Sequence, residues 1–255
     1  MRGPSVGAIP TDAVHWNPCA GEVGYTPHVE FYLDRLPPPQ RALWPRLRET
    51  PPQFVLYGGT AVALRLDHRE SEDFDFFSPE PFEPQELRNA VPYLRGAPVT
   101  QHEENTLTCA VGRGPVKVSF FGGVNIRAVH KPDLADNGLR IASLLDVAAT
   151  KAAAVQGRAS RKDYDDMAAI IEAGATLDDI LGAAAAVFGK ASFNPLITLK
   201  ALAHHDDKAL RDREGHGLSR SVRETLTHAV QDVDLSRIRV PETQPKMYEA
   251  DHSEQ

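Results

Sequence analysis

Two aspartates separated by one residue, Asp73 and Asp75, stand in an otherwise apolar run. Side chains of a strand alternate between its two faces, so both carboxylates would project from one face while Phe74 and Phe76 point to the other. Two carboxylates on one face can share divalent cations that also bind phosphate oxygens. Since apolar strands rarely hold two unpaired acids, the pair indicates a Mg²⁺ or Mn²⁺ site that handles a phosphate compound.

A Gly-Gly-Thr turn precedes the two aspartates. The apolar residues 54–57 predict a short strand that ends at Gly58 and Gly59, and an Ala-rich helix is predicted to follow with Thr60 as its cap. Glycines let the backbone approach a phosphate, and a helix N-terminus offers N–H groups to an anion. Arg69 lies between the turn and the aspartates, where its guanidinium could bind a phosphate through two hydrogen bonds.

Further charged residues lie in the second half of the chain. Lys151 and Arg158 are seven apart, so on one helix they share a face and could present two positive charges to a triphosphate. Lys162 at the start of the next helix could add a third. Asp163 either caps that helix or completes the site as a metal ligand or proton acceptor. Asp166, one turn later, either shares that second role or pairs with a basic residue.

The elements that must position these residues fall into two halves. Residues 27–135 read as an α/β core, with strands at 54–57, 74–77, 106–111 and 116–121 and a helix at 83–91. Residues 136–238 are Ala-rich and read as helices, at about 141–156, 160–172, 176 onward, 195–204 and 218–230. We predict that residues 1–26 form a loose arm and that residues 239–255 form a disordered tail.

Composition sets broader limits. The chain has 255 residues, 42% hydrophobic and 25% charged, as is usual for soluble globular proteins. No apolar run approaches the roughly 20 residues of a membrane helix. Two cysteines cannot build a disulfide framework or a four-cysteine metal site, so we expect a cytoplasmic protein. The net charge of −7 argues against a surface covered with phosphate-binding residues but permits a local basic groove.

The segment GGTAVALRLDHRESEDFDFFS, with Lys151, Arg158 and the later KDYDD run, resembles the DNA-polymerase-β-like nucleotidyltransferases. More narrowly, it resembles the AbiEii/AbiGii toxin group, which includes the MenT-type toxins, over roughly residues 40–210. The resemblance implies an α+β fold, with a polymerase-β-like nucleotidyltransferase core and mixed sheet in the N-terminal half and helices in the C-terminal half. It also implies the toxin of a toxin–antitoxin system, which moves NMP from a nucleoside triphosphate to an acceptor, tRNA or another RNA, and which has a cognate antitoxin as partner.

Residues and resemblance together predict one site. The predicted catalytic residues are Asp73, Asp75, Lys151 and Asp163, of which Asp73 and Asp75 also bind the metal; the predicted nucleotide-binding residues are Gly58, Gly59, Thr60, Arg69, Arg158 and Lys162.

The strand at 116–121 departs from the usual pattern, because Ser119 stands where many polymerase-β-like enzymes have a third carboxylate. Either an acid of the KDYDD run replaces that carboxylate, or the site binds nucleotide with reduced metal affinity and slower chemistry. Two other functions therefore stay open. One is a non-catalytic module that binds nucleotide or an antitoxin, and the other is nucleotidyl transfer to a small molecule.

Overall fold

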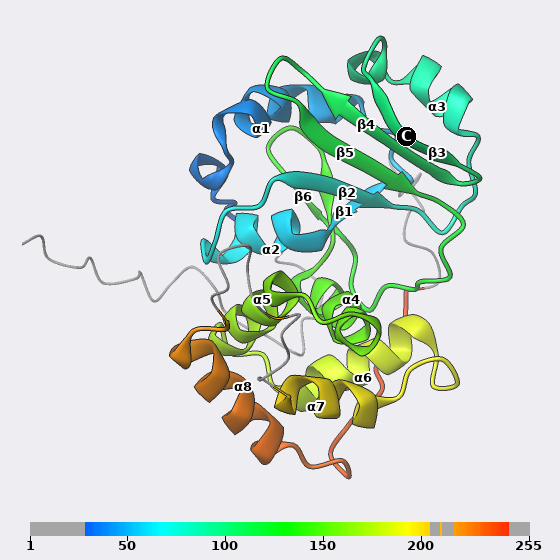
Figure 1. Ribbon diagram of the computed structural model, residues 1–255. Coiled ribbons are helices and arrows are strands. Elements are labelled where there is room, and N and C mark those ends of the chain that lie inside the picture. The colour runs from blue at the N-terminus through cyan, green and yellow to red at the C-terminus, as the bar shows by residue number, and fades with distance from the viewer. Residues whose placement is uncertain (1–28, 205–209, 211–216, 245–255) are drawn as a thin grey trace, which may run out of the picture.

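The computed structural model describes residues 29–204, 210 and 217–244. Within these residues a mixed sheet occupies the N-terminal half and helices form the C-terminal half, as predicted (Figure 1). The predicted arm lies outside the described residues. Residues 239–244, predicted as part of the tail, are instead held in place, since the Gln244 N–H donates to the Ala128 carbonyl at 2.8 Å.

The described strands form one seven-stranded sheet. They are β1 (Val55–Tyr57), β2 (Asp73–Phe77), β3 (Val99–Glu103), β4 (Thr106–Val111), β5 (Val116–Phe121), β6 (Asp133–Leu134) and β7 (Arg140–Ile141). Their order is β3-β4-β5-β2-β1-β7-β6, so β2 lies between β1 and β5 near the middle of the sheet. β2 runs antiparallel to β1 and parallel to β5. The strands predicted at 106–111 and 116–121 are confirmed.

The helix α2 (Gly58–Leu66) begins directly after β1. Its N-cap is Tyr57, so the prediction that Thr60 caps this helix was wrong. Gly58 adopts a φ of +74°, a conformation open to glycine, and the chain turns into the helix here, so the N-cap lies three residues earlier than predicted. Other helical segments of this half are η1 (Leu33–Arg35), α1 (Pro38–Leu43), η2 (Trp44–Glu49), α3 (Pro84–Ala90) and η3 (Pro92–Leu94).

The second half contains helices α4 (Leu144–Gly157), α5 (Arg161–Glu172), α6 (Leu177–Phe188), α7 (Pro195–Ala203) and α8 (Arg220–Asp232). Ser143 and Thr176 cap α4 and α6 through their side chains. Ser160 stands at the N-cap of α5 but makes no side-chain capping bond. None of the described helices has the length and apolar character needed to cross a membrane.

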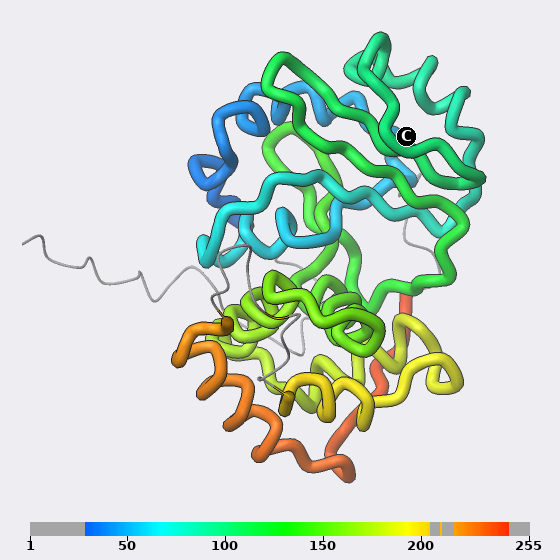
Figure 2. The backbone as a smooth tube through the Cα atoms, viewed as in Figure 1, coloured from blue at the N-terminus to red at the C-terminus, as the bar shows by residue number. Residues whose placement is uncertain are grey.

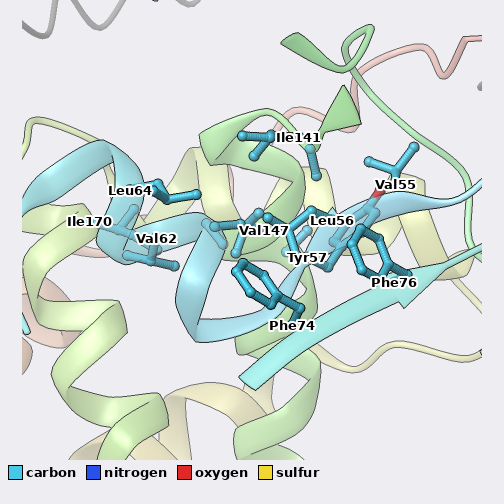
Figure 3. Close-up of a cluster of buried hydrophobic side chains, with 14 of the residues drawn as sticks. Val55, Leu56, Tyr57, Val62, Leu64, Phe74, Phe76, Ile141, Val147 and Ile170 are labelled. Atoms are coloured by element: carbon cyan, nitrogen blue, oxygen red, sulfur yellow. The ribbon is translucent and has the colours of Figure 1, made fainter. Parts of the chain in front are cut away.

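One hydrophobic core joins the two halves. The tube in Figure 2 shows α4 and α5 lying next to α2, and contacts link α2 with both helices. Figure 3 shows Val62 of α2, Phe74 of β2, Val147 of α4 and Ile170 of α5 in the same cluster. Each is fully buried, and burying one such side chain contributes about 1.5–3 kcal/mol. The core therefore fixes α4 and α5 relative to the end of β1 and the start of α2.

Candidate active site

Asp73 and Asp75 lie on one face of β2, as the alternation predicts. Both side chains are partly exposed, whereas Phe74 and Phe76 are fully buried on the opposite face. The antiparallel pairing with β1 sets Asp75 opposite Tyr57, the last residue before α2. The two carboxylates therefore lie beside the N-terminus of α2.

The two glycines of the turn allow close approach by charged side chains. A Cβ on Gly58 would lie 2.8 Å from Asp75 Oδ2, so only glycine leaves room for that carboxylate. A Cβ on Gly59 would collide with the Arg69 guanidinium and lie 3.0 Å from Ser71 Oγ. Thr60 is buried, and its hydroxyl donates to the backbone carbonyl of Asp73, which ties α2 to β2.

Strand β5 supplies two neighbours to the carboxylates. Lys117 pairs with Asp73 in the register, and its Nζ lies 3.3 Å from Asp73 Oδ2. Ser119, the residue at the position of the expected third carboxylate, pairs with Asp75 and is fully buried. Burial raises the pKa of Asp75; the positive charge of Lys117 opposes this rise and the negative charge of Asp73 adds to it.

The buried carboxylate of Asp166 contacts three basic side chains. Its oxygens accept hydrogen bonds from His68 Nε2 at 2.7 Å and from Arg69 Nε and Nη2 at 2.6 and 2.9 Å. Lys151 Nζ lies 2.6 Å from the same carboxylate. Burial by itself would raise the pKa of Asp166, but the His68 and Arg69 hydrogen bonds and the Lys151 charge hold it well below its usual range. Asp166 thus pairs with basic residues, the second of the two roles predicted for it.

Asp163 is a second buried acid in this network. It accepts from Lys151 Nζ at 2.8 Å and from Arg158 Nε at 2.9 Å. These contacts explain why it does not act as a capping acid for α5, so the capping interpretation was wrong. Lys151 and Arg158 converge on this carboxylate, but the prediction that they share a face of one helix was wrong, because α4 ends at Gly157 and Arg158 has an extended backbone. The Lys151 charge also reaches Asp75 and acts to lower its pKa, which connects the network to the β2 aspartates.

The structure thus brings most of the predicted residues into one region. Arg69 is held by Asp166 and packs against Gly59, and Lys162 lies on the exposed side, with its Nζ 3.9 Å from Glu72. Their roles toward a nucleotide stay predictions. Sequence reasoning missed Lys117, although alternation along β5 places it on the same face as Ser119. It also missed His68, for which no local pattern gave a signal.

The carboxylates of Asp73 and Asp75 fit a Mg²⁺ or Mn²⁺ ion. Mg²⁺ prefers oxygen ligands and is usually bound by one or two carboxylates, with water and substrate phosphates completing its shell. A bound cation would also stabilise the charged form of Asp75, and so oppose the two effects that raise its pKa, burial and the negative charge of Asp73. Among the described residues no group of three or more His, Cys, Asp or Glu side chains could hold a metal, so phosphate and water would supply the remaining ligands.

Comparison with known proteins bears on this arrangement. The family model described as "Nucleotidyl transferase AbiEii toxin, Type IV TA system" matches residues 41–234. The chain belongs to this family. The resemblance to the AbiEii toxin group drawn from the Gly-Gly-Thr and Asp-x-Asp motifs is thereby confirmed.

A curated relative of this AbiEii-family protein is an uncharacterized protein from Aquifex aeolicus, 35% identical over 117 residues. The match covers 45% of this chain and about half, 55%, of the relative. Among solved structures, MenT4, a nucleotidyltransferase toxin from Mycobacterium tuberculosis, is 14% identical with a TM-score of 0.49, covering 76% of this chain and 84% of that one. A putative nucleotidyltransferase from H. pylori is 17% identical with a TM-score of 0.44, covering 75% and 90%.

Proposed function

We propose that this AbiEii-family protein transfers a nucleotidyl group from a nucleoside triphosphate to RNA, with tRNA as the favoured acceptor, and so acts as the toxin of a toxin–antitoxin pair. The observation that carries the proposal is the placement of Asp73 and Asp75 against the N-terminus of α2. This arrangement supports a site in which the two carboxylates would bind a metal beside backbone N–H groups that would bind phosphate. Membership in the AbiEii family supports the same reaction and a cognate antitoxin as partner.

The proposed reaction is an in-line displacement. The acceptor hydroxyl oxygen bonds to the α-phosphorus, the bond from that phosphorus to the β-phosphate oxygen breaks, pyrophosphate leaves, and the hydroxyl proton passes to solvent water. Asp73 and Asp75 would hold a divalent cation, which when bound supplies orientation of the phosphates and partial neutralisation of their charge. The N–H groups at Gly58 and Gly59 would contact the terminal phosphates.

Several cations near the carboxylates favour a phosphate-rich substrate. Lys117, beside Asp73, has a side chain 54% exposed, so it can turn toward a bound phosphate. Lys151 is buried, and Asp163 and Asp166 hold it in place, which suits a charge that must stay fixed near the phosphates. In this proposal Lys117 is a mobile cation and Lys151 is a fixed one.

Two exposed basic side chains at the edge of the site favour RNA as the acceptor. Arg158 and Lys162 have side chains 67% and 63% exposed; Arg158 follows the end of α4 and Lys162 lies in the first turn of α5, beside the buried network. They form a local basic edge on a chain of net charge −7. An RNA acceptor would contact that edge through its phosphates, and its binding would weaken as salt is raised.

The test is transfer of label from each α-labelled nucleoside triphosphate, with Mg²⁺ and total cellular RNA, by the wild-type protein and an Asp73→Asn/Asp75→Asn variant. The proposal predicts labelled RNA from the wild type and a loss of at least about 100-fold in the variant. Glu72→Gln, a change in an exposed acid next to Asp73, is the matched control and should retain transfer. Label confined to a small-molecule fraction would instead support a small-molecule acceptor, and nucleotide binding without any transfer would support a non-catalytic module.

A further inference from the structure

Three rows of side chains cross the face of the sheet that carries the two aspartates. Each row is a registered pair of residues from the parallel strands β2 and β5: Asp73 with Lys117, Asp75 with Ser119, and Phe77 with Phe121. Successive rows lie two residues apart along the strands, which corresponds to about 7 Å. Along the strands, this face of the sheet therefore carries first an aspartate–lysine pair, then an aspartate–serine pair, and then two aromatic rings.

The aromatic row is a preformed stack. The rings of Phe77 and Phe121 lie 5.2 Å apart between centroids at an interplanar angle of 24°. Tyr57 contacts Phe77 edge-on, with centroids 5.4 Å apart, and so fixes the inner ring from the side of β1. Phe77 packs against the hydrophobic core.

Phe121 differs from its neighbour. It is partly exposed and is not among the side chains packed against the core; its ring rests on Phe77 at the end of β5. The buried face of β5 already carries Val116, Val118 and Phe120, so the core does not require a further ring on the site face. An aromatic ring left partly exposed beside a phosphate-binding site is suited to stacking with a ligand.

The order of the rows matches the order of groups in a nucleoside triphosphate. Phosphates at the N-terminus of α2 would lie between the Asp75 row and the Asp73–Lys117 row, where the carboxylates and the ammonium group gather. The sugar would then extend from the α-phosphate along the strands in the other direction. That direction leads to the Phe77–Phe121 row.

Resting on the proposed function, we propose that Phe121, supported by Phe77, is the platform on which the base of the nucleoside triphosphate stacks. Stacking engages the flat face common to all four bases, so the platform adds affinity for a nucleoside without selecting one base. It also places the sugar and the α-phosphate at a fixed distance from Asp75.

The test compares binding of a nucleoside triphosphate with binding of inorganic tripolyphosphate, which has no base, to the full chain in Mg²⁺ by calorimetry. Phe121→Ala should weaken binding of ATP and CTP by about 5- to 100-fold and leave tripolyphosphate binding within about twofold. Phe121→Tyr, which keeps the ring, should restore nucleotide binding. Equal losses for both ligands, or no loss for either, would overturn the platform while leaving the proposed phosphate site in place.

A second measurement covers the case in which the alanine variant does not fold. Phe121→Trp keeps an aromatic ring, and its added fluorescence should be quenched by nucleoside triphosphate but not by tripolyphosphate. Quenching by neither ligand, while calorimetry still detects nucleotide binding, would place the base elsewhere and refute the inference. A wild-type protein that binds neither ligand would contradict the proposed function itself, and the platform with it.

Discussion

Replacing Asp166 with Asn is expected to lower the free energy of unfolding by about 3–5 kcal/mol. The carboxylate has no solvent exposure and contacts Lys151, Arg69 and His68 at 2.6–2.9 Å. Asn keeps the size but removes the negative charge. Lys151, itself buried, would then keep only Asp163 as partner, and Arg69 would lose both of its charge-assisted bonds. Such losses are costly because the remaining charges stay out of water.

The assay is urea unfolding of the wild type and the Asp166→Asn variant at pH 7. Glu72→Gln provides the control, because the Glu72–Lys162 pair is exposed on both sides and 3.9 Å long, and its loss should cost less than about 1 kcal/mol. A loss of under about 1 kcal/mol for Asp166→Asn would refute the reasoning, since it would mean that the buried cations do not depend on this carboxylate.

The same pair of proteins should show a specific pH dependence. The folded-state pKa of Asp166 lies well below its usual range because hydrogen bonds from His68 and Arg69 and the charge of Lys151 outweigh burial. Its stabilising effect is therefore complete above the unfolded-state pKa of about 3.9 and is lost as pH falls from there through the folded pKa. The stability difference between wild type and variant should narrow below about pH 4, and a constant difference would contradict this cause.

Three further outcomes follow from the site. Gly58→Ala should abolish transfer because the added Cβ would meet the Asp75 carboxylate. Gly96→Ala is the control: Gly96 has a similar φ of +76° with nothing within 4 Å of the added Cβ, so this variant should lose about 1 kcal/mol of stability and keep its activity. Equal activity in the two variants would contradict the steric argument. Because burial raises the pKa of Asp75, Mn²⁺ binding measured by electron paramagnetic resonance should weaken on acidification at a higher pH than an ordinary aspartate would give. Lys117→Met should tighten nucleotide-free Mn²⁺ binding by about two- to fivefold, since the ammonium competes for Asp73; unchanged or weaker binding would refute that role.

Local sequence rules were sufficient for the centre of the site. Strand alternation predicts that Asp73 and Asp75 share a face, and the apolar run before Gly58 predicts the strand and turn beside them. Both features depend on neighbours within a few residues. The mixed sheet followed by helices was also predictable, because the change from β-branched and aromatic runs to Ala-rich runs is a property of composition.

Long-range pairing was not predictable in the same way. Arg69 and Asp166 are 97 residues apart, and nothing near either one indicates that they meet. Asp163 lies in a sequence that matches a capping box, yet its carboxylate accepts hydrogen bonds from Lys151 and Arg158. Such outcomes depend on which charges the tertiary fold buries together, and local patterns do not contain that information.

The most direct measurement uses one nucleoside triphosphate labelled either at the α-phosphate or at the γ-phosphate, incubated with the wild-type protein, Mg²⁺ and RNA. Nucleotidyl transfer at Asp73 and Asp75 predicts that only the α-label enters RNA, that the γ-label appears in pyrophosphate, and that both signals vanish in the Asp73→Asn/Asp75→Asn variant. Entry of the γ-label into RNA would show phosphoryl transfer instead. Transfer of the α-label that survives the double substitution would place the chemistry away from these carboxylates and contradict the proposed site.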